Sequence, residues 1–302
     1  MSEPAAEGAD TPSPPGSISF VLVTETGVHH AGPVLETIGA ALRPGDEAIL
    51  LARTDRIADL PRPAPPWLRV VGIPEASIFG LRGRIPAVAR REWIVLFEEH
   101  TYMTAATVAA LRAMIEERRD LDLIAILGKN LTSISPWGWA NFLHTFTHAW
   151  APVAQPPPFA PVTSVALRRA ALPGEGPLSD GEWELRIVPR LFAAGKVGWA
   201  NAIFIDHDRP LALVSCFAIN FHNGRAAGAQ LRRLGMPAPR IVGEGWHDLT
   251  QRPQQLVEAL APRWHELPAG TAWRLRVVGL AACLGKTMGA LLGPGRSPHL
   301  ID

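Results

Sequence analysis

The sequence has few cysteines and no excess of charge of either sign. Its two cysteines, Cys216 and Cys283, are far apart and match no disulfide or metal-binding spacing, so we expect a reducing compartment such as the cytoplasm. Lysine and arginine together number 29, against 28 aspartate and glutamate residues. A nucleic-acid-binding protein usually carries a basic excess or a basic stripe, and this sequence shows neither.

Long apolar runs are also scarce. Residues 1–17 are rich in Pro, Ala, Gly and acidic residues and contain no apolar run of the kind that a secretory signal has, so we expect a disordered tail there. The apolar stretch 277–293 is interrupted by Lys286 and is shorter than the roughly 20 residues that span a bilayer. We expect it to lie on a membrane surface or to pack against the rest of the protein, and Arg274 and Arg276 before it would suit an anionic leaflet.

Short apolar runs alternate with helical patterns along the first half of the chain. Such runs, lacking polar alternation, are typical of parallel strands buried on both faces. They occupy residues 18–23, 47–52, 68–73, 93–97 and 121–127. Helical patterns fall at 33–42, at 84–91 and after Thr104, a residue that can cap a helix. The alternation predicts an α/β fold with an open, mostly parallel sheet and helices on both faces.

The second half of the chain changes character. We expect a strand at 162–167, a helix at 182–194 closed by Gly195, and a strand at 197–205. Everything beyond residue 210 has a helical pattern. The sequence therefore predicts a tail over 1–17, an α/β domain over 18–210 and a helical C-terminal extension over 211–302.

Three polar residues, Glu98, Glu99 and His100, directly follow the strand predicted at 93–97. In open α/β sheets, ligands bind at the carboxyl ends of the strands. Carboxylate oxygens and an imidazole at this place could share a divalent cation that bridges two phosphates. The same residues would equally suit the cap of a strand and the start of a solvated loop, and their spacing leaves both interpretations open.

The order of these elements resembles the catalytic domain of glycosyltransferase family 2, which has a GT-A fold. Residues 82–100 (RGRIPAVARREWIVLFEEH) are similar to the stretch that leads from a family arginine to the Asp-x-Asp motif. Residues 98–100 occupy the position of that motif and resemble a subgroup with an acidic-acidic-His triplet. The resemblance covers residues 18–210 and implies a transfer of sugar from a nucleoside-diphosphate donor.

The resemblance implies roles for residues at the donor site. Glu98 would approach the donor ribose or a metal ion, Glu99 would lie beside it, and His100 would be a metal ligand. Arg82 would face the diphosphate, where a guanidinium suits bidentate contact; alternatively it is a surface arginine at a helix start. The metal would be Mg²⁺ or Mn²⁺.

The nucleotide base is less well specified. Thr24 and Glu25 match positions that contact the base in the family, although they would also suit a simple turn at a strand end. The Asp that usually ends the second strand is replaced by Ala52, and Asp55 follows three residues later. This departure leaves the identity of the base open.

Two further stretches resemble the family. Residues 178–196 (LSDGEWELRIVPRLFAAGK) match its acidic segment and following helix, which places Glu184 at the position of the catalytic base. Asp180 and Glu182 are alternatives, and all three would also suit a helix N-terminus through the helix dipole. Residues 201–210 (NAIFIDHDRP) place His207 where the family has a His near the metal or diphosphate. A base acting on the acceptor hydroxyl implies inversion at the anomeric carbon.

Two other patterns carry less information. Gly285-Lys286-Thr287 resembles the end of a phosphate-binding P-loop, but its first glycine is missing. His144 and His148 have the spacing of two zinc ligands on a helix, without an obvious third ligand.

We therefore expect a glycosyltransferase that acts on a saccharide or lipid-linked acceptor, located in the cytoplasm or at the inner face of the cell membrane. A GT-A-like binding or scaffold protein with a decayed site is the main alternative. A nucleotidyltransferase is a further one, although the loop over 24–32 lacks the basic residues that such enzymes usually have.

Overall fold

The computed structural model describes residues 14–24, 31–59, 64–74, 77–131, 135–158, 165–174, 177–178 and 182–295, without the side chains of residues 58, 59, 184 and 185. Every statement below concerns these residues. The tail expected over residues 1–17 lies mostly outside them.

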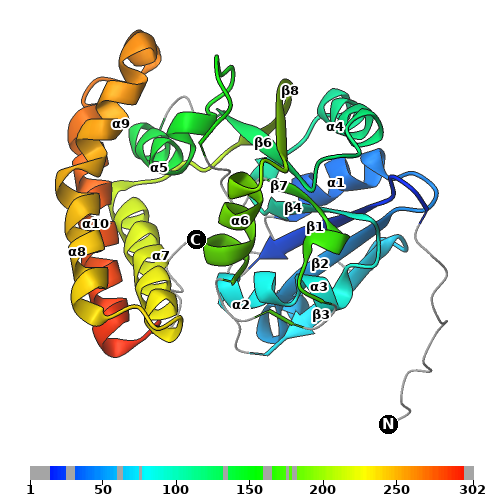
Figure 1. Ribbon diagram of the computed structural model, residues 1–302, viewed down its shortest axis with the longest axis horizontal. Coiled ribbons are helices and arrows are strands. Elements are labelled where there is room, and N and C mark those ends of the chain that lie inside the picture. Colours follow the sequence, from blue (N-terminus) through cyan, green and yellow to red (C-terminus); the bar gives the residue numbers. More distant parts are fainter. Residues whose placement is uncertain are drawn as a thin grey trace.

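The chain forms one eight-stranded sheet flanked by helices (Figure 1). Its strands are β1 (Ile18–Thr24), β2 (Glu47–Arg53), β3 (Leu68–Ile73), β4 (Trp93–Glu98), β5 (Thr101–Tyr102), β6 (Leu123–Asn130), β7 (Val165–Arg168) and β8 (Val197–His207). Up to β8 the helical segments are α1 (Gly32–Ala41), η2 (Thr54–Asp59), α2 (Ile78–Gly83), α3 (Ile85–Val88), α4 (Ala105–Glu117), α5 (Pro136–Phe146), η3 (Thr147–Ala149), η4 (Arg169–Ala171), η5 (Trp183–Ile187) and α6 (Val188–Ala193).

The strand order is β3-β2-β1-β4-β7-β6-β8-β5. The pairs β1/β2, β1/β4, β2/β3 and β6/β8 are parallel, and only β7 and β5 run against their neighbours. The predicted open, mostly parallel sheet is therefore confirmed. The carboxyl ends of β1, β4, β6 and β8 consequently meet at the same edge of the sheet, where open α/β sheets bind ligands.

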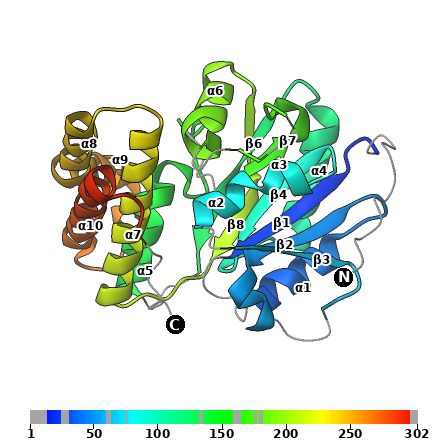
Figure 2. The ribbon, with the colours of Figure 1, turned by 90° about the horizontal axis from the view of Figure 1, so that it is seen from below.

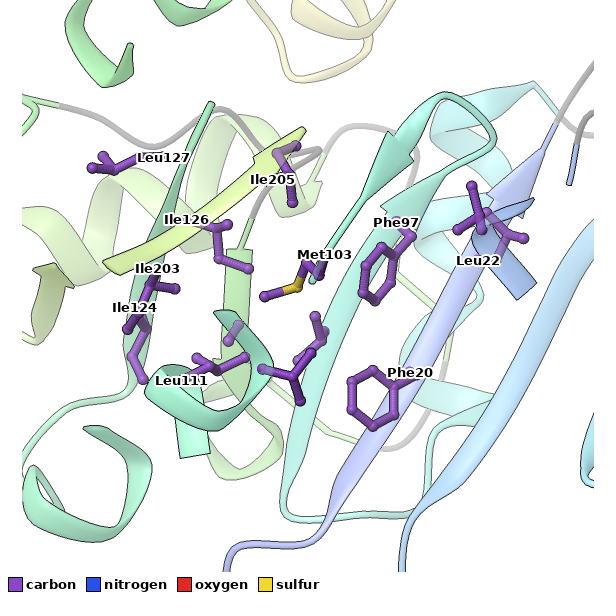
Figure 3. Packing of buried hydrophobic residues seen from close by; sticks show 14 of the residues in the cluster. Phe20, Leu22, Phe97, Met103, Leu111, Ile124, Ile126, Leu127, Ile203 and Ile205 are labelled. Atoms are coloured by element: carbon purple, nitrogen blue, oxygen red, sulfur yellow. The ribbon is translucent and has the colours of Figure 1, made fainter. Parts of the chain in front are cut away.

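The central strands are buried on both faces, which explains their unbroken apolar sequences. In β1, Phe20 and Leu22 face a cluster formed with α1, α4 and α5, while Val21 and Val23 face a second cluster formed with α2, α3 and α6. Figure 3 shows the first cluster, in which Phe20, Leu22 and Phe97 lie on one side, Leu111 lies beside the isoleucines of β6 and β8 on the other, and Met103 lies between the two groups. Helices thus cover both faces, as the sequence predicts.

The segment after β8 is helical. It contains α7 (Leu213–Arg233), α8 (Ala238–Thr250), α9 (Arg252–Leu260), η6 (Ala261–Glu266) and α10 (Thr271–Leu292). Together with α5 these helices form a bundle beside the carboxyl-end edge of the sheet (Figures 1 and 2). The Ser135 hydroxyl ties the start of α5 to the start of this segment, since it donates to the Leu211 carbonyl at 2.7 Å and accepts from the Leu211 amide at 3.0 Å.

Glycines allow the two longest helices of the bundle to approach backbone to backbone. A Cβ added at Gly285 or Gly289 of α10 would collide with the carbonyl oxygen of Phe221 or Arg225 on α7. Gly224 and Gly228 of α7 have the same relation to the α10 backbone. Gly285 and Gly289 in the apolar stretch 277–293 therefore serve helix packing. By length and composition α10 could cross a membrane. Half of the most apolar part of this helix is buried inside the protein, however, as in a core helix.

Two sequence predictions are corrected. The helix expected over 84–91 is instead the pair α2 and α3, which begins after the capping residue Ser77, whose hydroxyl accepts from the Gly80 amide at 3.2 Å. Pro86 lacks an amide proton, so one continuous helix cannot run through it, and the break falls at Arg84. The strand expected over 121–127 begins at Leu123, where pairing with Val197 of β8 starts.

Candidate active site

A cavity of about 370 Å³ lies between the carboxyl end of the sheet and the helical bundle. One wall comes from α2 and from the ends of β4 and β8, and the opposite wall comes from α5 and α7–α10. The polar and charged side chains of the sheet wall are Arg82, Glu98, Glu99, His100, His207 and Arg209. Those of the helical wall are Asn141, His144, Thr145, Asn220, His222, Asn223, Asp248, Arg252 and Lys286.

A buried ion pair lies at the base of the sheet wall. The guanidinium of Arg82 in α2 donates to the carboxylate of Glu98, and their side chains are only 6% and 11% exposed. The Glu98 backbone is fixed by Thr101, whose hydroxyl accepts from the Glu98 amide and donates to its carbonyl, both at 2.9 Å. Because each charge neutralises the other, the pair can exist where water is excluded.

Next to this pair, His100 and His207 bring two imidazoles together. Their ring centroids are 4.7 Å apart and the ring planes meet at 81°. The short strand β5 creates this contact, because it pairs Thr101 with His207 in antiparallel fashion, and the Asp208 amide donates to the His100 carbonyl at 2.9 Å. The carboxylate of Glu98 lies 3.5 Å from Nε2 of His100.

Both imidazoles are neutral at physiological pH. Burial, followed by the positive charge of Arg209, holds the pKa of His100 well below its usual range, and the same two causes lower the pKa of His207 to about 3. Nδ1 of each ring is buried and makes no hydrogen bond within the described part of the chain. A neutral imidazole with an unused ring nitrogen is the form that coordinates a metal ion. Among the residues whose positions are described, however, no group of three His, Cys, Asp or Glu side chains surrounds a common point.

The structure thus brings together five of the residues predicted for the site, namely Arg82, Glu98, Glu99, His100 and His207. It places two others elsewhere. Thr24 ends β1 in a buried position that does not border the cavity. Asp55 is exposed in η2, where Arg53 donates to its two oxygens at 3.0 and 2.7 Å and lowers the pKa of the carboxyl.

The candidates for the catalytic base are only partly visible. Glu182 precedes η5, 3.8 Å from Arg186, and does not border the cavity. Glu184 lies within the wide π-helical turn of η5, a type of turn frequent at functional sites, but its side chain is outside the described atoms. Asp180 and Glu25 lie outside the described residues.

Of the residues of the helical wall, only His144, as one of two possible zinc ligands, and Lys286, as part of an incomplete P-loop pattern, entered the sequence predictions, and neither was given a role at the donor site. Lys286 donates to Asp248, and Nη1 of Arg252 lies 3.5 Å from the second oxygen of that carboxylate. Asn220 donates to Asn141 at 2.9 Å. Two features of the sequence pointed to this wall: Lys286 interrupts an apolar stretch, and His222 lies in a helical region. Neither feature indicated which side chains would contact each other in the fold. Arg209 stood within the stretch matched around His207, without an assigned role.

No sequence-family profile matches the chain, and no curated protein sequence matches it. Solved structures do. The mannosyltransferase PcManGT from Pyrobaculum calidifontis, in complex with GDP-Man and Mn²⁺, superposes with a TM-score of 0.54 at 14% identity, over 95% of this chain and 90% of that one. Glucosyl-3-phosphoglycerate synthase from Mycobacterium tuberculosis, with Mn²⁺, UDP and glucosyl-3-phosphoglycerate, gives 0.46 at 18% identity over 73% and 81% of the chains. TarS 1–349 of S. aureus gives 0.42 at 11% identity over 89% and 90%.

At 14% identity, the superposition on PcManGT shows a common fold and nothing finer. The architecture described above, a mostly parallel sheet with helices on both faces and a helical C-terminal segment, is a GT-A fold of the kind found in nucleotide-sugar glycosyltransferases.

Proposed function

We propose that this protein is a glycosyltransferase that moves a sugar from a nucleoside-diphosphate donor to a saccharide or lipid-linked acceptor. One observation carries the proposal. Within a GT-A fold, α2 and the ends of β4 and β8 bring two buried neutral imidazoles, a buried Arg–Glu pair and Arg209 into a single cavity at the ligand-binding edge of the sheet. Arg82 and Arg209 have the charge and hydrogen-bonding geometry that a diphosphate requires.

A divalent cation completes the proposed donor site. His100 and His207 would supply two ligands through their Nδ1 atoms, which make no hydrogen bond to any described residue, and phosphate oxygens and water would supply the rest. Imidazole is a poor ligand for Mg²⁺, so of the two ions expected from the sequence we favour Mn²⁺. When bound, the ion would neutralise charge on the departing nucleoside diphosphate. The structure of PcManGT, which contains GDP-Man and Mn²⁺, supports this assignment.

For the acceptor, we propose that Glu184 removes the hydroxyl proton as the oxygen attacks the anomeric carbon, which inverts the configuration. Asp180 and Glu182 are the alternatives on the same segment. The resemblance to family 2 supports this order of preference. Glu184→Gln is expected to lower kcat by two to four orders of magnitude, roughly the contribution of general base catalysis, without a matching change in donor KM. An equal loss in Glu182→Gln or Asp180→Asn alone would reassign the base.

The direct test is turnover of nucleotide sugars. Purified protein would be incubated with a panel of UDP-, GDP-, ADP- and dTDP-sugars and Mn²⁺ or Mg²⁺, and release of nucleoside diphosphate would be followed. We expect slow hydrolysis of one donor, abolished by His100→Ala and retained by His265→Ala, a control at an exposed histidine of η6. Release of sugar 1-phosphate in place of nucleoside diphosphate would indicate a nucleotidyltransferase, and a failure to bind or cleave any donor would indicate a decayed site.

We also propose a peripheral contact with the inner face of the cell membrane. Val242 and Trp246 of α8 and Leu280, Leu284 and Leu291 of α10 are exposed, and the two helices pack side by side. Deleting α10 would destroy the bundle, so the test uses the single substitution Leu284→Glu on α10, with Val214→Glu on α7 as the control. The wild type and Val214→Glu should float with phosphatidylserine vesicles in a density gradient, and Leu284→Glu should not. Equal flotation of both variants would contradict the contact.

A further inference from the structure

The helical wall of the cavity contains a charged cluster that fold stability does not explain. Lys286 is the sole Lys, Arg, Asp, Glu or His residue within the apolar stretch 277–293, yet its side chain is only 15% exposed. It donates to Asp248, which is 9% exposed and also approached by Arg252. Replacing such buried ion pairs with apolar residues often leaves the stability of a protein unchanged or raises it. Their presence in a helix interface is therefore better explained by a function than by stability.

The cluster opens into the cavity and is positively charged. All three side chains border the cavity opposite the sheet wall. Lys286 and Arg252 carry two positive charges, against one negative charge on Asp248. The neighbouring His144 adds none, because burial and the charge of Arg252 lower its pKa to about 3. The helical wall therefore has a net charge of about +1 where it faces the space beside the proposed donor site.

Lys286 also has hydrogen-bonding capacity to spare. An ammonium group has three N–H donors, and within the described part of the chain the only hydrogen bond of the Lys286 ammonium group is the one to Asp248. Arg252 donates its Nη2 to the His144 carbonyl at 3.1 Å, which holds the guanidinium beside the lysine. Asp248 thus orients Lys286 and uses one of its protons, leaving the others for a ligand oxygen in the cavity.

We propose that the helical wall is the acceptor subsite and that Lys286, supported by Arg252, binds a phosphate group carried by the acceptor. The proposal rests on the proposed function for its assignment to the acceptor, but the binding of phosphate can be measured independently. A lysine ammonium is a compact charge well suited to phosphate. Both a soluble sugar phosphate and a phosphate headgroup in a membrane would present this chemistry.

The test is calorimetric titration of the full chain with inorganic phosphate and with glucose 6-phosphate, using glucose as the uncharged comparison. We expect the wild type to bind both phosphates and not glucose. Lys286→Met should weaken binding by at least about tenfold, the loss of one charge-assisted hydrogen bond. Lys196→Met, at the exposed turn before β8, should change nothing. Binding of vesicles containing phosphatidic acid, lost in Lys286→Met, would point to the membrane-borne source; binding of glucose 6-phosphate without vesicle binding would point to the soluble one.

Two further variants make the test decisive. Asp248→Asn removes the opposing charge and should tighten phosphate binding, an effect that a purely structural role would not produce; it also decides the question if Lys286→Met fails to fold. Arg209→Met shows whether phosphate binds instead at the proposed donor site on the sheet wall. Phosphate binding lost in Arg209→Met but kept in Lys286→Met would overturn the proposal, as would an absence of phosphate binding or weaker binding in Asp248→Asn. Failure of the proposed function would show differently, as absent binding of every nucleoside diphosphate.

Discussion

His100, in the turn between β4 and β5, and His207, at the end of β8, are distant in the sequence, yet their rings meet at 81° with centroids 4.7 Å apart. The two-residue strand β5 makes the contact by pairing with the end of β8. We predict that the two residues act together on a metal ion. In electron paramagnetic resonance titrations with a nucleoside diphosphate present, His100→Ala and His207→Ala should each abolish Mn²⁺ binding, and EDTA should stop donor hydrolysis. Undiminished Mn²⁺ binding in either variant would remove that residue from the site.

The buried pair Arg82–Glu98 is predicted to matter for stability as well as for the donor. Glu98→Ala leaves the guanidinium buried without its carboxylate, which should lower the free energy of unfolding by about 3–5 kcal/mol. Urea denaturation followed by circular dichroism measures this loss. The double variant Arg82→Met, Glu98→Leu should recover most of it. The exposed pair Arg118–Asp120 provides the control, since Asp120→Asn should leave the urea midpoint unchanged; equal losses in both pairs would contradict the argument.

Close packing of α7 against α10 should make the bundle sensitive to a single methyl group. Gly289→Ala places a Cβ against the Arg225 carbonyl, a rigid backbone atom, and should destabilise the protein by about 1–3 kcal/mol or more. Gly243→Ala on the exposed side of α8 meets no atom within 4 Å and should be neutral or stabilising by up to about 1 kcal/mol. Thermal unfolding of the two variants separates the cases. A stabilised Gly289→Ala protein would show that the helices are farther apart.

The low pKa of His144 predicts a dependence of stability on pH. Its pKa is about 3 in the folded protein and near 6.5 when unfolded, so between these values the unfolded state binds the extra proton. The contribution of His144 to the free energy of unfolding is therefore fully present above about pH 6.5. It decreases as the pH falls below this value, by at most about 1.4 kcal/mol per pH unit. His144→Gln should flatten the slope between pH 5 and 6.5, whereas His265→Gln should not. Parallel slopes for wild type and His144→Gln would contradict the burial of His144.

The sequence alone was informative about the sheet and about half of the site. Strands buried on both faces, such as β1 and β4, leave unbroken apolar runs, and a strand that ends in Glu98-Glu99-His100 places those residues at the ligand-binding edge whatever follows. His207 was assigned to the site through the resemblance of residues 201–210 to family 2, and in the structure it ends β8. Local sequence therefore specifies residues at strand ends well.

The helical wall could not be predicted because its residues meet only through tertiary packing. Lys286 resembled an interruption of an apolar stretch until α10 packed against α8 and placed it beside Asp248. The glycines around it resembled a flawed P-loop, although they are required for close contact with α7. Asp55, three residues past the expected position, turned out to be engaged by Arg53.

Equilibrium binding of nucleoside diphosphates tests the central claim most directly. Calorimetric titrations of UDP, GDP, ADP and dTDP, each with Mn²⁺, would be made on the wild type, on Arg209→Met and on Lys196→Met. The account predicts metal-dependent binding of one nucleotide, weakened at least about tenfold by Arg209→Met and unaffected by Lys196→Met. Binding that ignores Arg209, or no binding of any nucleoside diphosphate, would contradict a donor site in this cavity.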